Sequence, residues 1–342
     1  MLVLSDCLTS KIDEGCLKVA NSLTKRLKKS SDNTIIVSYD RKPDYSDEHI
    51  ATNKLFFNPK LLMLVHSNKP VMYIPFASNT TASCVRCLIL SIFSGHKLNV
   101  LFVLRFPMKP FAKACLKLSG AKVIALSEAS YQFYRNIVGN KAFYLKTGID
   151  LKKFIPVTSE QKKVIRQKYN IPEDKKVLLH VGHLKAGRNI DKLYSVDKKF
   201  HVVLVVSSVT EAEKDAELRA KLESRGDITI IDSYLENVQE VYQMADVYFF
   251  PVQEVENCID VPLSVLEAAA CNTPIVTTEY GELASFRGKD GFCFIDDFSS
   301  DVLNAALSTM SEKKDVDTRL AVKDYDWDCS IQKLQKWLGE KI

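Results

Sequence analysis

The first half of the chain alternates short apolar runs with longer segments whose apolar residues recur at helical spacing. In residues 14–29, Leu17, Ala20, Leu23 and Leu27 fall on one face of a helix. The alternation predicts strands at 1–4, 34–37, 71–74, 99–104, 123–126 and 142–145, and helices at 14–29, 82–93, 111–118 and 128–137. Residues 41–54 are polar and are expected to form a loop.

The pattern stops at residues 146–163, where Gly148, Pro156 and polar residues interrupt it, and then restarts. The restarted pattern predicts strands at 177–181, 202–206, 228–231, 247–250, 274–277 and 292–295. It predicts helices at 211–223, 238–244, 262–271 and 300–311, and one further helix that begins at 189. Such alternation is typical of parallel sheets covered on both faces. We therefore expect an α/β protein of two doubly wound, Rossmann-like domains, 1–155 and 156–324, facing each other across a cleft.

The composition of the 342 residues is that of a soluble globular protein. The longest clean apolar runs, such as 71–75 and 100–104, are far shorter than the ~20 residues of a membrane span. No basic residues precede the apolar start of the chain, so a secretory signal is not expected. Nine cysteines, an odd number, indicate reduced thiols, and we expect a cytoplasmic protein.

The charge is unevenly divided along the chain. Residues 1–155 contain 23 Lys and Arg against 10 Asp and Glu, a balance of +13, whereas residues 156–342 contain 24 against 32, a balance of −8; together they give the net charge of +5. A basic half favours an anionic partner, such as nucleic acid, a membrane surface or a phosphorylated substrate. The alternative is an uneven surface charge without a function.

The turn from Gly182 to Asn189 follows a predicted strand and leads into a predicted helix. Its spacing is similar to that of a phosphate-binding P-loop, but Arg188 replaces the lysine and Asn189 replaces the hydroxyl that would bind magnesium. This excludes a P-loop ATPase or kinase, and the absence of Gly-x-Gly-x-x-Gly argues against a dehydrogenase. A glycine-bearing turn with an arginine is still a good anion site. The alternative is a tight turn with a solvated Arg188.

Residues 262–276 contain a buried helix that begins at Pro262 and carries one acid, Glu267. A carboxylate in an apolar helix is costly unless it is hydrogen-bonded. Ribose hydroxyls would satisfy it, and so would the backbone or a neighbouring lysine. Cys84 and Cys87 have metal-site spacing, but they lie in an apolar helix without a second ligand pair and are interpreted as core thiols. No histidine spacing indicates a zinc site.

Five segments, in the correct order, resemble the retaining family-four glycosyltransferases, which have the GT-B fold. The segments that carry the resemblance are Leu145–Pro156, Gly182–Leu193, Ala245–Pro251, Pro262–Val276 and Tyr325-Asp326-Trp327. The likeness is strong in the second half of the chain. In the first half it rests only on Asp13-Glu14-Gly15 and Ala125-Leu126-Ser127.

The resemblance implies that the second domain binds a nucleotide-sugar donor and the first domain an acceptor. It also implies a final helix, 325–342, that packs back toward the first domain. The implied donor-binding residues are Glu267 for the ribose, His183 at an arginine position of the family, Gly15 beside a phosphate, and Leu263 and Ser264 through their backbone N–H groups.

The resemblance also implies three catalytic residues. Arg188 stands at the position of the family's diphosphate-binding lysine, and Arg105 at that of an active-site histidine. The family's Glu-x7-Glu motif has Ile259 in place of its first Glu, and the nearest acid is Asp260, one position later. No metal and no other cofactor is implied, because Arg188 and helix dipoles would stabilise the leaving diphosphate.

We therefore expect a metal-independent, retaining glycosyltransferase that uses a UDP- or GDP-sugar. The acceptor is a saccharide, with a lipid-linked saccharide as the hypothesis, and a soluble anionic acceptor stays open. The basic cluster of Lys25, Arg26, Lys28 and Lys29 is hypothesised to dock on anionic lipid at the cytosolic face of a membrane.

Three alternatives stay open. A non-catalytic GT-B subunit that binds nucleotide or a partner glycosyltransferase is favoured by Ile259 and Arg105. A nucleotide-sugar epimerase fits the helix of Glu267 less well than a transferase does. A nucleic-acid binder has the least support, because no basic motif is interleaved with aromatic residues, and we expect no nucleic-acid partner.

Overall fold

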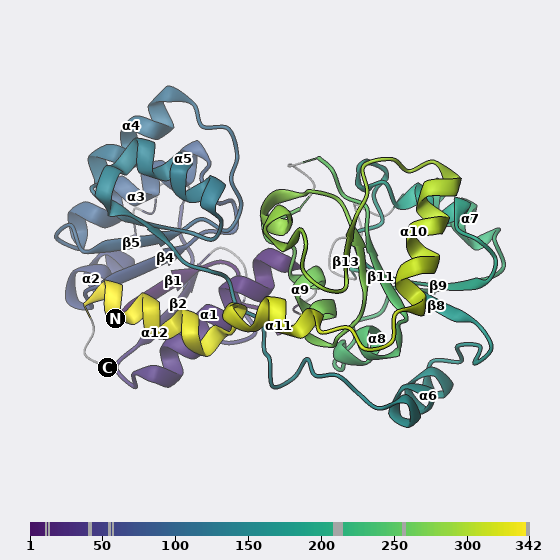
Figure 1. Ribbon diagram of the computed structural model, residues 1–342. Coiled ribbons are helices and arrows are strands. Elements are labelled where there is room, and N and C mark those ends of the chain that lie inside the picture. Colours follow the sequence, from purple (N-terminus) through teal and green to yellow (C-terminus); the bar gives the residue numbers. More distant parts are fainter. Residues whose placement is uncertain are drawn as a thin grey trace. The chain divides into compact units, whose positions relative to one another are not determined.

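The computed structural model of the protein describes residues 1–10, 12, 14–39, 43–53, 56, 58–207, 215–254 and 258–339. The chain forms two compact units (Figure 1). Unit 1 contains Met1–Gly148 and Trp327–Ile342, and unit 2 contains Ile149–Asp326. Each unit has its own parallel sheet and is described by itself.

Unit 1 is built on a seven-stranded parallel sheet with the order β3-β2-β1-β4-β5-β6-β7. The strands are short and mostly buried: β1 Leu2–Ser5, β2 Ile35–Tyr39, β3 Glu48–Ile50, β4 Val71–Ile74, β5 Leu98–Leu101, β6 Lys122–Ala125 and β7 Ala142–Tyr144. The chain runs outward from β1 in one direction and then from β4 in the other, which is the doubly wound pattern.

Six α-helices cover this sheet: α1 Gly15–Ser30, α2 Pro59–Ser67, α3 Thr81–Phe93, α4 Pro110–Ser119, α5 Glu128–Val138 and α12 Trp327–Leu338. Alternate strand residues, such as Leu2 and Leu4, share one core with residues of α2 to α5, so these four helices cover the same face. Helices α1 and α12 pack against each other on the other side (Figure 1). Trp337 of α12 stacks on Phe143 of β7, with ring centres 4.5 Å apart.

Unit 2 is built on a six-stranded parallel sheet with the order β10-β9-β8-β11-β12-β13. Its strands are β8 Lys176–Gly182, β9 Phe200–Val206, β10 Ile228–Ile231, β11 Val247–Phe250, β12 Ile275–Thr277 and β13 Phe292–Phe294. Its α-helices are α6 Ser159–Lys168, α7 Ala216–Glu223, α8 Gln239–Met244, α9 Leu263–Ala270, α10 Ser300–Glu312 and α11 Thr318–Val322. The order reverses at β8, which lies between β9 and β11. Ligands of such sheets bind beyond the carboxyl ends of the strands at this point.

The segments by which the chain enters and leaves unit 2 lie side by side. The N–H of Ile149 donates a hydrogen bond to the carbonyl of Tyr325 (2.7 Å), and Ile149 forms a parallel bridge with Asp326. These contacts tie residues 149–155, which the sequence analysis places in the first domain, to unit 2.

The structure confirms the expected fold class, since both sheets are parallel and doubly wound. Three local expectations are wrong. Residues 41–54 include the edge strand β3, a short and half-polar strand without an apolar run. Helix α2, which Asn58 caps, was not expected. Residues 146–163 contain the start of the polar helix α6, which a capping box of Thr158 and Gln161 initiates.

Two further expectations concern the helix after residue 189 and the cysteines. The helix expected from 189 is a 3-10 helix over Ile190–Ser195. Cys84 and Cys87 are buried core thiols of α3, and all nine cysteines are free. No α-helix in the described ranges is both long and apolar enough to cross a bilayer.

Candidate functional site

The turn after β8 has a defined, hydrogen-bonded geometry. The N–H of Lys185 donates to the carbonyl of His183 (3.0 Å), and the N–H of Arg188 donates to that of Lys185 (3.1 Å). Asn189 has a left-handed backbone, with φ of 58°, and its side chain donates to the carbonyl of Pro251 just beyond β11 (3.0 Å). The turn is therefore fixed against the end of the neighbouring strand.

Arg188 is buried, with only 8% of its surface exposed, and this contradicts a solvated side chain. The guanidinium of Arg188 can pack at this position because residue 182 is glycine: a Cβ on residue 182 would lie 2.9 Å from Arg188 Nη1. Burial raises the pKa of the Cys258 thiol, and the Arg188 guanidinium, which hydrogen-bonds to this thiol, opposes the rise. A positive charge is thus held at the carboxyl end of β8.

Tyr280 connects Arg188 with Asp260. Burial raises the pKa of Tyr280; the Asp260 carboxylate adds to the rise and Arg188 opposes it, so both charges lie near this ring. The Tyr280 hydroxyl donates to the carbonyl of Cys258 (2.6 Å). Asp260 is half-buried, and Ile259, at the position of the family's first glutamate, is buried.

Helix α9 carries the buried acid. Glu267 is 3% exposed and accepts a hydrogen bond from the hydroxyl of Tyr242 in α8 (2.7 Å). Burial, and next the charge of Glu267, hold the pKa of Tyr242 well above its usual value, so the tyrosine remains a donor. The sequence analysis missed this partner, because Tyr242 precedes Glu267 by 25 residues.

The first turn of α9 lies at the end of β8. Leu263 is buried, and Ser264 is hydrogen-bonded to the hydroxyl of Tyr248, which in turn donates to the carbonyl of Val181 (3.3 Å). The ring centres of Tyr248 and Tyr242 are 5.9 Å apart. Two tyrosines therefore link the start of α9, the end of β8 and the carboxylate of Glu267.

His180, inside β8, is a site residue that the sequence analysis missed. It is completely buried; its Nδ1 bonds to the carbonyl of Phe249 (2.8 Å), and its Nε2 has no hydrogen-bond partner. A Cβ on Gly182 would lie 3.0 Å from this Nε2, so the imidazole borders the place where Arg188 packs. Burial lowers the pKa of His180 to about 4, which keeps the ring neutral beside Arg188.

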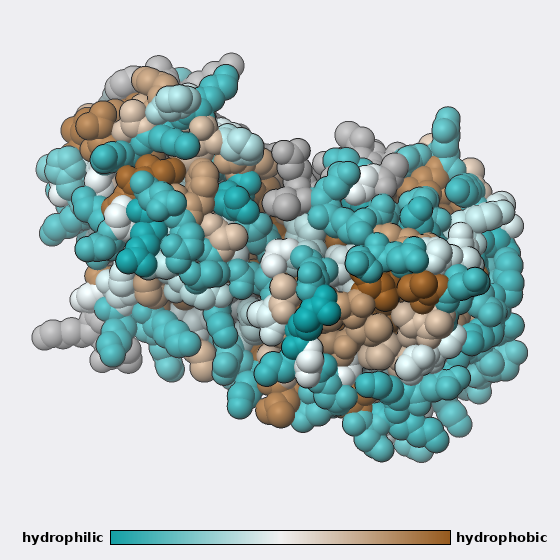
Figure 2. Space-filling view, turned by 45° about the horizontal axis from the view of Figure 1, so that its top comes forward, coloured by the Kyte–Doolittle hydropathy of each residue, from teal (hydrophilic) through white to brown (hydrophobic). Residues whose placement is uncertain are grey.

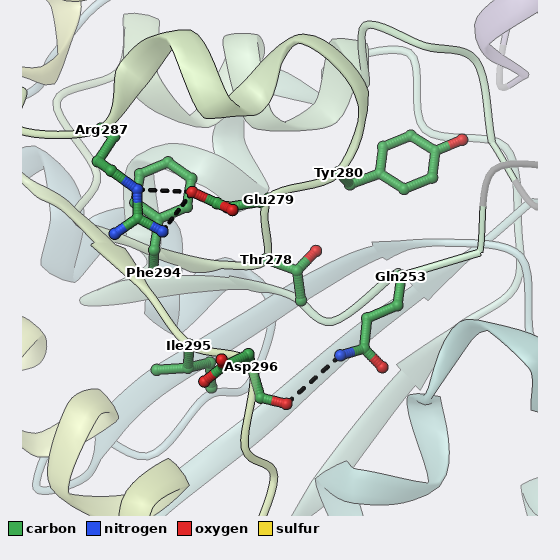
Figure 3. Close-up of a pocket in the computed structure, with 8 residues that line it drawn as sticks. All are labelled: Gln253, Thr278, Glu279, Tyr280, Arg287, Phe294, Ile295 and Asp296. Carbon is green, nitrogen blue, oxygen red and sulfur yellow. Dashed lines mark hydrogen bonds and ion pairs between the residues drawn. The ribbon is translucent and has the colours of Figure 1, made fainter.

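A cavity of about 320 Å³ adjoins these residues (Figure 3). It lies at the carboxyl ends of β11, β12 and β13, and its lining includes Gln253, Thr278, Tyr280 and Asp296. Gln253 accepts a hydrogen bond from Asn189 (3.1 Å), so one wall of the cavity is joined to the Arg188 turn. In Figure 3, Arg287 and Glu279 form an ion pair at one side of the cavity.

The structure divides the expected site residues between the units. Arg188, His183, Asp260, Leu263, Ser264 and Glu267 gather in unit 2 around the ends of β8 and β11. Gly15, the first residue of α1, and Arg105, whose guanidinium lies 5.9 Å from the ring centre of Phe133, belong to unit 1. Asp13 lies outside the described residues. Across the described ranges, no cluster of three or more His, Cys, Asp or Glu is arranged to hold a metal ion.

Comparison with known proteins identifies similar sequences and folds. Residues 161–327 match the family model of glycosyl transferases group 1. Over 195 residues the chain is 24% identical to TuaC of Bacillus subtilis, named for glycosyltransfer in teichuronic acid biosynthesis. The match covers 56% of this chain and 46% of TuaC, so the chain spans about half the length of that relative.

Solved glycosyltransferases share the fold. A Rickettsia africae glycosyltransferase superposes with a TM-score of 0.74 at 14% identity, covering 98% of this chain and 97% of its own. Anabaena Alr3699/HepE in complex with UDP superposes with a TM-score of 0.75 at 14% identity, covering 99% of both chains. The chain thus has the two-sheet fold of GT-B glycosyltransferases, and its residues 161–327 match the family model of glycosyl transferases group 1.

Proposed function

We propose that the protein is a glycosyltransferase that transfers a sugar from a nucleoside-diphosphate donor to an acceptor with retention at the anomeric carbon. The bond between the anomeric carbon and the diphosphate oxygen breaks, a bond from this carbon to the oxygen of an acceptor hydroxyl forms, and the hydroxyl proton passes to the departing diphosphate. The observation that carries the proposal is the buried Arg188, which packs at Gly182 at the end of β8 and hydrogen-bonds to Cys258, in the unit whose helix α9 holds the buried Glu267.

Five of the expected site residues in unit 2 have a role in this proposal. Arg188 binds the diphosphate and stabilises the charge that builds on it as it leaves, together with the N–H groups of Leu263 and Ser264. Glu267 accepts from the ribose hydroxyls, and Asp260 lies at the sugar. These fixed charges and dipoles supply the stabilisation without a metal. Donor binding is supported by the UDP complex of HepE, which shares the fold.

The acceptor proposed for unit 1 is a lipid-linked saccharide, with Gly15 and Arg105 as the site residues proposed for this unit. Such an acceptor requires a peripheral protein at the cytosolic face of a membrane. The basic balance of residues 1–155 supports contact with an anionic surface.

The test is calorimetric titration with UDP, GDP, ADP and TDP and their common sugar conjugates. We expect one base to bind. Glu267→Gln, which keeps an acceptor for Tyr242, should weaken binding about tenfold or more, because a hydrogen bond to a charged group contributes ~1.5–3 kcal/mol. Glu217→Gln, on the exposed side of α7, is the matched control. If no nucleotide binds to the folded protein, the donor-site proposal is wrong.

One observation favours a non-catalytic subunit as the second candidate. Ile259 is 7% exposed at the position of the motif's first acid, so no carboxylate is available there. Nucleotide binding without release of free nucleoside diphosphate, across a panel of lipid-linked and soluble saccharide acceptors, would support the subunit. Turnover with any acceptor would support the transferase, and turnover without one would indicate an epimerase.

A further inference from the structure

One long stretch of unit 1 carries only positive charge. Residues 49–127 contain eight lysines and two arginines, but no aspartate and no glutamate. This stretch supplies α2, α3 and α4, which cover the same face of the sheet. The outer side of these helices therefore has no acidic side chain of its own to neutralise its lysines.

Helix α4 also exposes a hydrophobic stripe. Phe111 is 62% exposed and Leu118 is 71% exposed. With Ala114 between them, they follow an i, i+3, i+7 spacing that puts all three on one side of the helix. Lys113 and Lys117 are exposed and lie one turn apart along the border of this stripe. The opposite side of α4 is buried in the core, so the stripe is not part of the packing of unit 1.

The stripe continues onto the end of α3. The hydroxyl of Ser91 donates to the carbonyl of Ser119, which holds the last turns of α3 and α4 together. Ile92, next to Ser91, is 59% exposed, and Phe93 is 37% exposed. Figure 2 shows hydrophobic side chains beside hydrophilic ones over this part of unit 1. The α3–α4 face is defined here as Ile92, Phe93, Phe111, Lys113, Lys117 and Leu118.

The basic cluster on α1 differs from the α3–α4 face, because two of its four cations have carboxylate partners inside unit 1. Lys25 lies 4.9 Å above the ring of Tyr45, much as Lys113 of the α3–α4 face lies 5.9 Å from the ring centre of Phe133. Lys28 forms an ion pair with Asp47 (3.0 Å). Arg26 lies 3.8 Å from a carboxylate oxygen of Asp328. These contacts reduce the charge that α1 can offer to an external surface.

We propose that the α3–α4 face docks on an anionic lipid bilayer, with its apolar side chains in the headgroup–acyl boundary and its lysines on lipid phosphates. Proteins that bind such a membrane interface expose aliphatic and aromatic side chains that are bordered by lysines and not by acidic residues. The aliphatic members Ile92 and Leu118 favour lipid over nucleic acid, which binds basic grooves through aromatic stacking. The proposal rests on the membrane contact proposed above and assigns a surface to it; it does not depend on the donor site, which the calorimetric titration tests separately.

Vesicle sedimentation of the full chain tests this docking. We expect the protein to pellet with vesicles of phosphatidylcholine and phosphatidylglycerol, and not with phosphatidylcholine alone. The Lys113→Gln/Lys117→Gln variant should weaken partitioning into the vesicles about 30-fold, because two lysines at an anionic surface usually contribute that much to binding. Phe111→Ser/Leu118→Ser should weaken it at least tenfold. All four side chains are exposed, so circular dichroism should show an unchanged fold.

Two matched controls test whether binding depends on the α3–α4 face itself or on any loss of surface charge or of exposed apolar side chains. Lys25→Gln/Lys29→Gln removes the same charge from α1, and Val164→Ser/Leu320→Ser removes two exposed apolar side chains of unit 2, 65% and 57% exposed. Both controls should partition like the wild type. Equal losses in the controls, or no binding of the wild type to anionic vesicles, would overturn the proposal. Binding of a single-stranded oligonucleotide instead of vesicles, weakened by the Lys113/Lys117 variant, would overturn it in favour of nucleic acid.

Discussion

The buried His180 makes the stability of unit 2 depend on pH in a calculable way. Its pKa is lowered to about 4 by burial, against an ordinary value of 6.5. Below pH 6.5 the unfolded chain therefore binds a proton that the folded chain does not bind until about pH 4. The stability is complete above pH 6.5, falls between pH 6.5 and 4, and is level again below that range.

The size of this loss follows from the shift. At ~1.4 kcal/mol per pKa unit, a shift of about 2.5 units gives a full loss of ~3 kcal/mol and a loss of ~2 kcal/mol at pH 5. His180→Asn removes the titration, because an amide does not titrate in this range. The Asn amide can still donate to the carbonyl of Phe249, as Nδ1 does at 2.8 Å.

The assay is urea unfolding at pH 7 and pH 5, followed by circular dichroism and tryptophan emission. Both tryptophans, Trp327 and Trp337, lie in unit 1, so a transition seen by circular dichroism and not by emission belongs to unit 2. We expect the stability difference between wild type and His180→Asn to change by ~2 kcal/mol between the two pH values. His66→Asn, an exposed position of unit 1, is the control. An equal difference at both pH values would refute the reasoning.

Two further predictions concern glycines. Gly148→Ala should destabilise unit 1 by ~1–3 kcal/mol, because a Cβ there would collide with the backbone and ring of Trp327; the tryptophan emission transition in urea measures the loss, and an unchanged midpoint would contradict it. Gly281→Ala should weaken nucleotide binding as well as unit 2 stability, because residue 281 has φ of 52° and a Cβ would collide with the carbonyl of Asp260. Calorimetry checks this, and loss of stability without loss of affinity would separate Asp260 from the donor site.

The sequence predicted the central strands because each is a short, largely apolar run. All four residues of β4 and of β11, for example, are buried. It missed β3, which lies at the sheet edge and has one buried residue. It missed α6 because that helix is polar on most sides and depends on its Thr158 cap and on Arg166, which binds the carbonyl of Met244 (2.9 Å). The spacing of apolar residues along the sequence does not reveal contacts of this kind.

The candidate site was predictable in its charged residues and not in their partners. Arg188 and Glu267 stand out because a charge in an apolar segment is unusual. Tyr242 and Cys258 are ordinary residues in the sequence, and become part of the site only when β8, α8 and α9 are packed together. His180 differs from its neighbours in β8 only in being polar, and its environment follows from the missing Cβ of Gly182.

Because α12 is part of unit 1, the order of synthesis and the order of folding differ. A ribosome makes all of unit 2 before it reaches Trp327, whose ring packs against Gly148, and Trp337, which stacks on Phe143. Domains usually fold as they emerge, the N-terminal one first. Here the unit that begins first is completed last, and the nascent chain must hold a seven-stranded sheet that lacks its last covering helix while its second unit folds. Chaperones that bind nascent chains would find their exposed substrate in the first unit.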